Sequence, residues 1–196
     1  MTDIWLIRHA EPEECIRGRC YGSLDVGLSA TGREDAASLA DRLADEPLAA
    51  IYSSPRIRAI QTAGAIAAPR GLAITLEPAF RELDFGDFEG RAYDEIAAAF
   101  PELYRRWMET PTEVRFPNGE SFRQMRERVL AAHGSLLARH EGQNIAIVAH
   151  GGTARIIIAE ALGIPPANIF RIAQKHAALN RLRCYDGCCI VEALNA

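Results

Sequence analysis

Apolar residues in this chain form short uninterrupted runs, and segments of helical periodicity lie between them. Runs such as IWLI at residues 4–7 contain no polar residue, which is typical of strands buried on both faces. We therefore predict strands at 4–7, 49–54, 72–78, 144–150, 178–185 and 188–194, the last two forming a hairpin around Asp186 and Gly187. The periodic segments predict helices at 31–45, 54–67, 120–140 and 153–163, with one or two short helices between 92 and 108.

One of these helices carries an arginine close to its start. Ser54 is a suitable N-cap and Pro55 suits the first helical position. Apolar or small residues then recur at intervals of three and four, which predicts that one face packs on the sheet, formed by Ile57, Ile60, Gly64 and Ala67. On this pattern Arg58 lies off the packed face and near the helix N-terminus.

Strand-like and helical segments alternate along most of the chain. This order predicts an α/β layered fold with a mainly parallel sheet. A length of 196 residues fits a single domain, residues 1–196, and the sequence contains no internal repeat, low-complexity tract or linker.

Composition narrows the class of protein. Apolar residues make up 48% and charged residues 24%, and the net charge of -4 gives no support to a nucleic-acid partner. No apolar run approaches the ~20 residues that span a bilayer, so we expect no membrane association. The five cysteines are an odd number without paired C-x-x-C spacing, so a disulfide framework is not expected. With no signal-peptide core before Arg8, we expect the protein in a reducing cytoplasm.

Two histidines stand in the same context. His9 follows the apolar run IWLI and Arg8, and His150 follows IAIVA, so both lie at the end of a predicted strand. Parallel strands in an open sheet bring their carboxyl ends to one edge, where ligands bind. A lone histidine at the end of a strand usually has a structural role, but two histidines at equivalent strand ends favour a ligand-binding site. Zinc is one alternative, although Arg8 would place a second positive charge beside the metal.

An anion fits these residues better than a cation. Arg8 adjoins His9, Arg58 stands in the first turns of a helix, and the amides from Gly151 onward begin another helix, where a phosphate gains hydrogen bonds. Arginines offer forked donors to phosphate oxygens. We therefore predict that Arg8, His9, Arg58 and His150 form a phosphate pocket that needs no metal.

Other phosphate chemistries are excluded by the sequence. No cysteine is followed six residues later by the arginine of the cysteine phosphatases, the P-loop-like GSLDVGLS has Leu28 in place of lysine, and no G-x-G-x-x-G is present. A neutral histidine can attack phosphorus itself. The leaving alkoxide then needs a proton, for which the segment RELDFGDFEG offers four carboxylates that spacing alone does not separate: Glu82, Asp84, Asp87 and Glu89.

Five motifs in order resemble those of the histidine phosphatase superfamily, from about residue 4 to 194. They are LIRHAE, LSATGREDA, YSSPRIRAIQTA, ELDFGDFEG and VAHGG. The resemblance implies a phosphoglycerate mutase-like fold, a three-layer α/β/α sandwich. It also implies that His9 is the phosphorylated nucleophile, that Arg8, Arg58 and His150 hold the phosphoryl group, and that Glu82 is the general acid. No cofactor is implied.

The chain departs from the family pattern at two positions. Ala10 replaces the usual glycine, which is tolerable if its backbone does not need a positive φ. Cys15 stands where many members carry an asparagine that helps to bind phosphate. A neutral loop thiol is the simplest interpretation of Cys15.

The resemblance further indicates the phosphatase branch, because the inserted segment of the mutases is missing. RGRCYGSLDVGLS and FPNGESF resemble segments of α-ribazole 5'-phosphate phosphatases of cobalamin synthesis, and Tyr21 and Gly22 are expected on the substrate side. We expect a small phosphorylated substrate. Phosphatases of sugar phosphates or protein phosphohistidine, a phosphoglycerate mutase, and a phosphate- or partner-binding module without turnover stay open, as does the oligomeric state.

Overall fold

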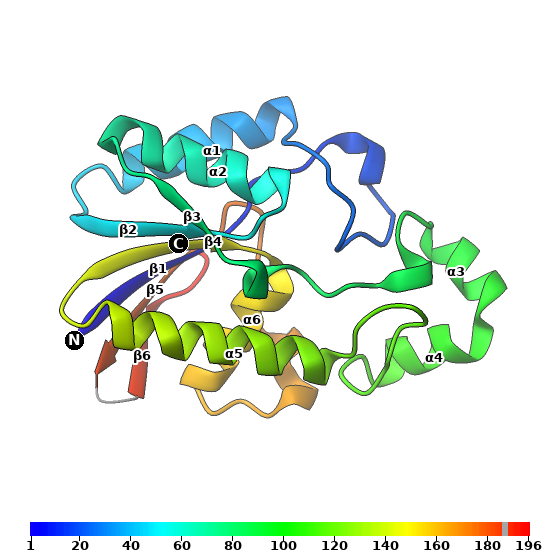
Figure 1. Cartoon of the computed structure of the whole chain (residues 1–196). Coiled ribbons are helices and arrows are strands. Elements are labelled where there is room, and N and C mark those ends of the chain that lie inside the picture. The colour runs from blue at the N-terminus through cyan, green and yellow to red at the C-terminus, as the bar shows by residue number, and fades with distance from the viewer. Residues whose placement is uncertain (186–187) are drawn as a thin grey trace.

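A six-stranded sheet forms the centre of the computed structural model, which describes residues 1–185 and 188–196 (Figure 1). The strand order is β3-β2-β4-β1-β5-β6. The strands are β1 (Thr2–Arg8), β2 (Leu48–Ser53), β3 (Ile74–Leu76), β4 (Asn144–Ala149), β5 (Leu179–Tyr185) and β6 (Cys188–Ala193). Strands β3, β2, β4 and β1 are parallel, and β5 and β6 add an antiparallel edge. The predicted mainly parallel sheet is confirmed.

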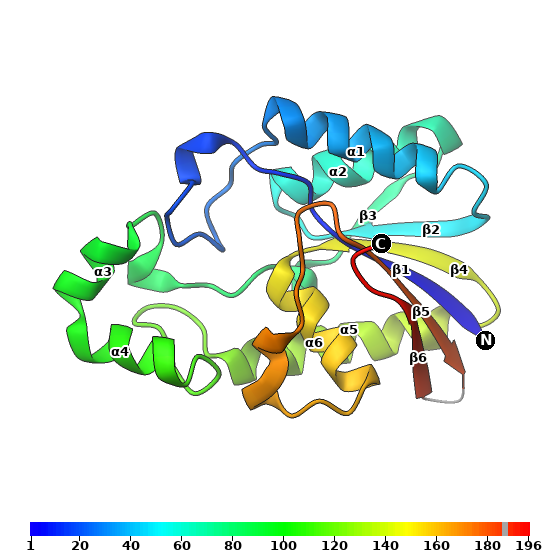
Figure 2. The ribbon, with the colours of Figure 1, turned by 180° about the vertical axis from the view of Figure 1, so that it is seen from behind.

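Helices cover both faces of the sheet, which makes the predicted three layers. Figures 1 and 2 show α1 (Ala30–Arg42) and α2 (Ile57–Ala67) on one face and α5 (Phe122–Arg139) and α6 (Gly151–Ala161) on the other. The short helices α3 (Tyr93–Ala99) and α4 (Pro101–Glu109) project to one side. Turns of 3-10 helix occur at Glu14–Ile16, Ala68–Arg70, Pro78–Phe80, Gly86–Phe88 and Pro166–Arg171.

Strand β1 is buried on both faces, as its unbroken apolar run predicts. Ile4 and Leu6 belong to the core cluster that α5 and α6 cover, whereas Trp5 and Ile7 belong to the cluster beneath α1 and α2. Successive side chains of a strand point to opposite faces, so one strand contributes to both cores. The end of β1 is therefore a rigid support for the residues that follow it.

The packing face predicted for α2 is wrong except at Ala67, which is buried. Ile57 is 41% exposed and Ile60 is half-buried, whereas the buried residues are Arg58, Ala59, Thr62, Ala63, Ile66 and Ala67. Small side chains let the helix lie close to the sheet, and the arginine is buried on the same side because it reaches a polar site. The helix also begins later than predicted, at Ile57 with Arg56 as its N-cap, so Ser54 is free for another role.

A disulfide joins the antiparallel strands β5 and β6, contrary to the expectation from cysteine spacing. Cys184 of β5 pairs directly with Cys189 of β6 in the antiparallel register, with a Cα–Cα distance of 4.1 Å. The C-x-x-C rule does not detect such cross-strand neighbours. The predicted turn of this hairpin, Asp186 and Gly187, lies outside the described residues.

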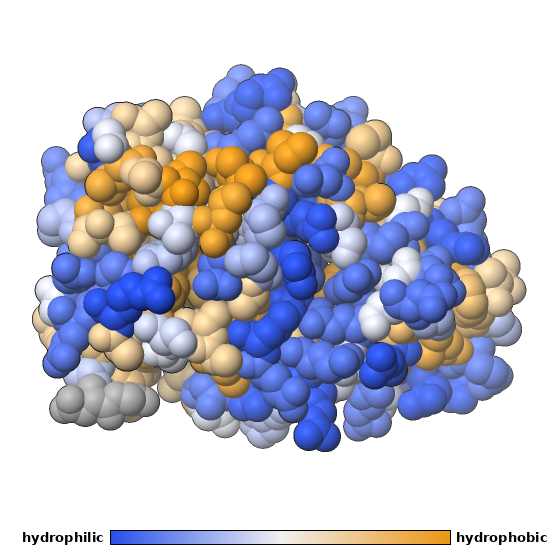
Figure 3. Space-filling model, viewed as in Figure 1, coloured by the Kyte–Doolittle hydropathy of each residue, from blue (hydrophilic) through white to orange (hydrophobic). Residues whose placement is uncertain are grey.

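The surface is divided between apolar and polar regions. Figure 3 shows an apolar area over α2 and β3, where Ile57 and Leu76 are exposed, beside a largely hydrophilic area over the middle of the same face. Among the described residues, no helix combines the length and the apolar character needed to cross a membrane.

Candidate active site

The two histidines singled out in the sequence meet at one edge of the sheet. Strands β1 and β4 are parallel neighbours with Arg8 opposite Ala149, so His9 and His150 follow at the same level. Their ring centroids lie 5.1 Å apart. Together with five other side chains they line a small pocket of about 120 Å³: Arg8, Tyr21, Arg58, Glu82 and Phe85. All five residues predicted for the phosphate chemistry are thus brought together.

His9 presents an unprotonated nitrogen to this pocket. Its Nδ1 lies 2.8 Å from the carbonyl oxygen of Ala10. Because a carbonyl only accepts, Nδ1 carries the proton and Nε2 keeps its lone pair. The ring is 2% exposed, and its burial, followed by the charges of Arg58 and Arg8, holds the pKa of His9 well below 6.5. A neutral, fixed imidazole is the form that a nucleophile requires.

His150 is equally buried and is oriented by a serine. Its Nε2 lies 2.7 Å from Ser54 Oγ, and its Nδ1 lies 3.4 Å from a terminal nitrogen of Arg58. Because the guanidinium only donates, Nδ1 accepts and Nε2 carries the proton. Burial and then the charge of Arg58 hold the pKa of His150 well below 6.5. The residue lies at the N-cap of α6, where the helix dipole favours a bound anion.

The two arginines are held by main-chain carbonyls. Arg58 is fully buried and donates to the carbonyls of Leu24 at 2.7 Å and Gly22 at 2.8 Å, with its guanidinium carbon 5.1 Å from the Tyr21 ring centroid. Arg8 donates to the carbonyl of Gln174 at 2.6 Å. In both arginines Nε is buried without a hydrogen-bond partner among the described residues. These charges have no carboxylate partner at hydrogen-bond distance in the described chain, so an anion is the complementary ligand.

Glu82 is the one carboxylate of its segment that lines the pocket. Its two oxygens accept hydrogen bonds from the amides of Leu83 at 2.9 Å and Gly152 at 3.0 Å, the latter in the first turn of α6. A β-carbon at Gly152 would overlap Oε1 of Glu82. Glycine is required at position 152 because the Glu82 carboxylate lies so close to the backbone there. This contact holds the carboxylate beside the histidines.

The other three carboxylates of the segment have structural partners. Asp84 accepts from the Gly86 amide, and Asp87 accepts from the side chain of Asn118. Glu89 binds a series of main-chain amides, those of Gly22, Ser23, Leu24 and Phe85. Glu89 therefore holds the loop whose carbonyls bind Arg58.

Gly22 and Gly151 border the site without lining the pocket. A β-carbon at Gly22 would overlap the carbonyl of Leu83, so this glycine allows the two loops to touch. Gly151 begins α6 beside Arg8, whose Nε would be 3.5 Å from an added β-carbon. Tyr21 does line the pocket, as expected.

The two departures from the family pattern are accommodated differently. Ala10 is fully buried, packs near Leu28 and Ala36, and is not among the residues with positive φ. Its methyl group is therefore compatible with the backbone. Cys15 is exposed on the first 3-10 turn and does not line the pocket.

Several residues around the site were missed in the sequence. Ser54 was interpreted as a helix cap and instead orients His150. His176 lies 3.0 Å from a terminal nitrogen of Arg8, and its ring centroid is 5.5 Å from that of His9. Burial and then the charge of Arg8 lower the pKa of His176 to about 4. No motif in the sequence marks His176, because only the fold brings it to β1.

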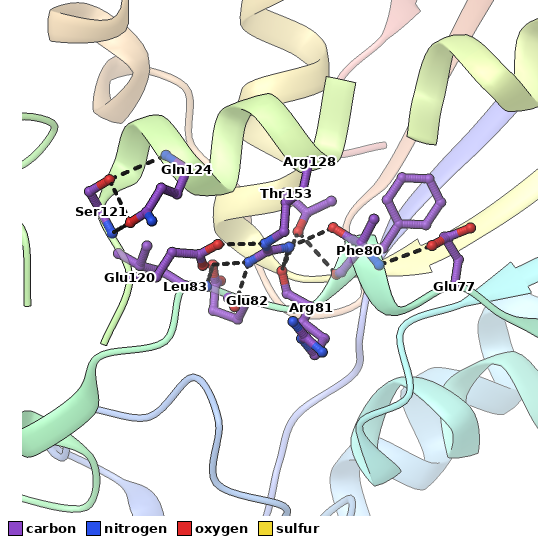
Figure 4. A network of polar contacts seen from close by, with 11 residues as sticks. Glu77, Phe80, Arg81, Glu82, Leu83, Glu120, Ser121, Gln124, Arg128 and Thr153 are labelled. Carbon is purple, nitrogen blue, oxygen red and sulfur yellow. Dashed lines mark hydrogen bonds and ion pairs between the residues drawn. The ribbon is translucent and has the colours of Figure 1, made fainter. Parts of the chain in front are cut away.

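Arg128 and Glu120 form an ion pair next to the backbone of Glu82 (Figure 4). Arg128, from α5, pairs with Glu120 at 2.7 Å and donates to the carbonyls of Arg81 at 2.8 Å and Glu82 at 3.0 Å. Glu120 belongs to FPNGESF, a segment noted in the sequence only for its resemblance. In the structure Glu120 accepts hydrogen bonds from Arg128 through both of its carboxylate oxygens.

One metal-capable cluster occurs in the described part of the chain, away from this pocket. His133, Cys184 and Cys189 have ligand atoms within 4.8 Å of one another. Cys184 lies opposite Thr2, at the amino end of β1, whereas His9 follows the carboxyl end. The two sulfurs are bonded to each other, so this cluster does not offer two thiolates in the structure described.

Comparison with known proteins agrees with the arrangement. The profile of the histidine phosphatase superfamily (branch 1) matches residues 4–196. Phosphoserine phosphatase 1 of Hydrogenobacter thermophilus is 37% identical over 84% of this chain and 78% of its own length. Phosphoglycerate mutase-like protein 4 of Arabidopsis thaliana is 33% identical over 95% and 81%. The structure of a putative alpha-ribazole-5'-P phosphatase from Escherichia coli K-12 superimposes with a TM-score of 0.93 at 27% identity, covering 100% of this chain and 96% of that one.

Proposed function

The chain belongs to the histidine phosphatase superfamily, and from this premise we propose that it hydrolyses small phosphomonoesters without a metal, through a phosphohistidine on His9. One observation carries the proposal. The unprotonated Nε2 of a buried, neutral His9 shares a pocket with two arginines and with the carboxyl group of Glu82. A nucleophile, cationic donors and a proton source are the parts that phosphoryl transfer needs.

The reaction has two halves. Nε2 of His9 attacks phosphorus as the ester P–O bond breaks, and Glu82 gives its proton to the leaving oxygen. Water then attacks the phosphohistidine, Glu82 takes a proton from it, and the P–N bond breaks to release phosphate and free His9. Arg8, Arg58 and His150 stabilise the equatorial oxygens, which is the part that metal ions play in other phosphoryl transferases.

The physiological substrate is proposed from two sources. The sequence segments around Tyr21 and Glu120 and the Escherichia coli structure support α-ribazole 5'-phosphate, which would place the enzyme in cytoplasmic cobalamin synthesis. The identity to phosphoserine phosphatase 1 supports phosphoserine. A mutase-type transfer is the second candidate function, favoured by the mutase-like relative.

A phosphate-release screen tests the proposal. It should include an aryl phosphate, α-ribazole 5'-phosphate, phosphoserine, sugar phosphates and phosphohistidine peptides, with and without EDTA. Turnover should survive EDTA and disappear in His9→Ala, while His140→Gln, altered away from the pocket, should keep it. EDTA-sensitive turnover, or full activity of His9→Ala, would overturn the proposal.

Two further readouts separate the alternatives. Quenched single-turnover samples of the wild type should contain an acid-labile phosphate on His9. Isomerisation of a phosphoglycerate faster than its hydrolysis would establish a mutase instead. Calorimetric phosphate binding without hydrolysis across the panel would establish a binding module.

A further inference from the structure

Two larger cavities each share a wall residue with the phosphate pocket. The first, here called the Glu82 chamber, has a volume of about 340 Å³, and Glu82 lies in its wall as well as in that of the pocket. The second, the Tyr21 chamber, has about 250 Å³ and shares Tyr21 with the pocket. The part of the substrate that leaves with the ester oxygen must occupy one of them.

The chemistry of the proposed reaction selects the Glu82 chamber. A general acid must lie within hydrogen-bond reach of the oxygen that it protonates. In-line attack by His9 also sends the leaving oxygen away from that histidine. The leaving group therefore extends from the phosphate toward Glu82 and into the cavity beyond it.

Polar side chains line most of the Glu82 chamber. They include three arginines, Arg56, Arg81 and Arg128, and three carboxylates, Glu82, Asp84 and Glu120. Arg128 is already neutralised, because Glu120 binds it through both carboxylate oxygens at 2.7 Å. Neither Arg56 nor Arg81 makes a side-chain hydrogen bond or an ion pair with the residues that the structure describes, and Nε of Arg56 is buried. In Figure 4 the guanidinium of Arg81 points away from the Arg128 network.

Two unpaired guanidinium groups, the half-buried Arg56 and the exposed Arg81, are available at the exit of the phosphate pocket to an anionic ligand. A guanidinium binds a carboxylate through parallel hydrogen bonds, which fixes the orientation of the carboxylate as well as its position. The two arginines of the Tyr21 chamber are paired, Arg17 with Glu14 at 3.3 Å and Arg19 with Glu95 at 3.9 Å. Glu11 and Glu13 line the same chamber without an ion pair among the described residues and would repel an anion. A substrate with an acidic leaving group is complementary to the first chamber and not to the second.

We propose that the leaving group carries a carboxylate that Arg56 and Arg81 bind, so that the substrate is the phosphate ester of a small hydroxy or amino acid. This inference rests on the phosphatase function proposed above. It disfavours α-ribazole 5'-phosphate, whose leaving group has no acidic substituent. It also assigns Arg56 a role in substrate specificity, although no pattern in the sequence singled this residue out.

Matched substrate pairs test the assignment. 3-Phosphoglycerate and glycerol 3-phosphate differ only by a carboxylate in place of a hydroxymethyl group, and phosphoserine and phosphoethanolamine differ by a carboxylate in place of hydrogen. We expect wild-type kcat/KM to be at least about tenfold higher for the acidic member of each pair, as one or two charged hydrogen bonds allow. α-Ribazole 5'-phosphate belongs in the same assay.

Arg56→Gln and Arg81→Gln should each lower kcat/KM about tenfold more for 3-phosphoglycerate than for glycerol 3-phosphate. The effect should lie mainly in KM. Arg123→Gln, an exposed arginine of α5 away from the chamber, should leave the ratio between substrates unchanged. The neutral substrate reports on folding, so a general loss of structure would lower both members alike.

Equal losses for both members of a pair, or a wild-type preference for α-ribazole 5'-phosphate, would overturn the inference while leaving the phosphatase function intact. A higher rate with glycerol 1,3-bisphosphate, which has no carboxylate, than with 3-phosphoglycerate, lost in the same variants, would overturn the inference by identifying a second phosphate in place of the carboxylate. Absence of hydrolysis for every ester would instead contradict the proposed function itself.

Discussion

Arg128 and Glu120 form a bidentate ion pair in which Nε and one terminal nitrogen of the arginine each lie 2.7 Å from a different carboxylate oxygen. The remaining donors of Arg128 bind three main-chain carbonyls in the segment that leads to the pocket, those of Ala79 at 2.5 Å, Arg81 at 2.8 Å and Glu82 at 3.0 Å. Figure 4 shows that these contacts converge on one guanidinium. Arg128 is thus a positioning residue for the backbone that carries Glu82.

Substitution of Arg128 should impair the proposed general acid more than the nucleophile. In Arg128→Gln we expect kcat/KM, which reports the step in which the leaving oxygen takes its proton, to fall about 10- to 100-fold for alkyl phosphates, because general acid catalysis contributes about 10²–10⁴-fold. Hydrolysis of p-nitrophenyl phosphate, which needs little protonation, should fall much less. Steady-state kinetics on a series of esters with graded leaving-group pKa measures the difference.

Arg123→Gln is the matched control for this series, since Arg123 lies on the same helix with its side chain 86% exposed. A merely structural role of Arg128 would give the same loss for every ester. That outcome would contradict the positioning role.

A methyl group at Gly152 should disable the same carboxyl group from the opposite side. Its β-carbon would overlap Oε1 of Glu82. Gly152→Ala should therefore lower kcat about 100-fold or more for alkyl phosphates as Glu82 is displaced. Gly134→Ala, in α5, is the control, because a β-carbon at Gly134 would meet no atom of the described residues within 4 Å. The added helix propensity should keep or raise the stability of this variant. Normal alkyl phosphatase activity in Gly152→Ala would show that Glu82 is not needed at this place.

The convergence of the two histidines was predictable because it depends on a local rule. Two apolar runs ended in histidine, and parallel neighbouring strands bring their carboxyl ends to one edge. The sequence pattern did not establish that β1 and β4 are neighbours. The structure shows this, because the two strands pair with Arg8 opposite Ala149. Glu82 was separated from the other carboxylates only by family resemblance. The structure adds the reason that Glu82 alone of the four lines the pocket with the histidines.

Features that depend on long-range packing were not predictable. The periodicity of α2 suggested that its isoleucines face the sheet, but Arg58 must be buried to reach the pocket, and this rotates Ile57 to the surface. The Arg128 contacts join α5 to a loop more than 40 residues earlier in the chain. Neither the burial of Arg58 nor the contacts of Arg128 produces a residue spacing that can be recognised in a single sequence.

His133 should make the protein sensitive to acid. It is 8% exposed, Nε2 has no hydrogen-bond partner in the described chain, and burial lowers its pKa from 6.5 to about 4. Below pH 6.5 the unfolded chain binds a proton that the folded chain does not, so the free energy of unfolding falls as the pH falls toward 4. The loss from this residue is about 2 to 3 kcal/mol between pH 6.5 and 4.5.

His133→Leu removes that titration. The difference in unfolding free energy between the variant and the wild type, measured by denaturant titration, should be constant above pH 6.5 and should shift in favour of the variant as the pH falls to 4.5. The comparison cancels the contributions of the other buried histidines. Parallel pH profiles for the two proteins would show that His133 is not buried in its neutral form.

The Cys184–Cys189 disulfide fixes how many thiols each state of the protein exposes. Cys15 and Cys188 are exposed and should react with Ellman's reagent in the folded protein, whereas Cys20 is buried, and burial raises the pKa of its thiol. We expect two reactive thiols when folded, three after unfolding without reductant, and all five after reduction, as the sequence contains five cysteines.

The same disulfide should stabilise the hairpin modestly. The bridged residues are 5 apart in sequence, and closing so short a loop corresponds to about 2 kcal/mol in the chain-entropy model. Cys184→Ala/Cys189→Ala should lower the free energy of unfolding by about that amount under oxidising conditions, and a thiol reductant should reproduce the effect in the wild type but not in the double variant. Cys188→Ala, one residue away on β6, should remain close to the wild type. Five reactive thiols in unfolded protein that has never been reduced would show that the two strands are held by hydrogen bonds and packing alone.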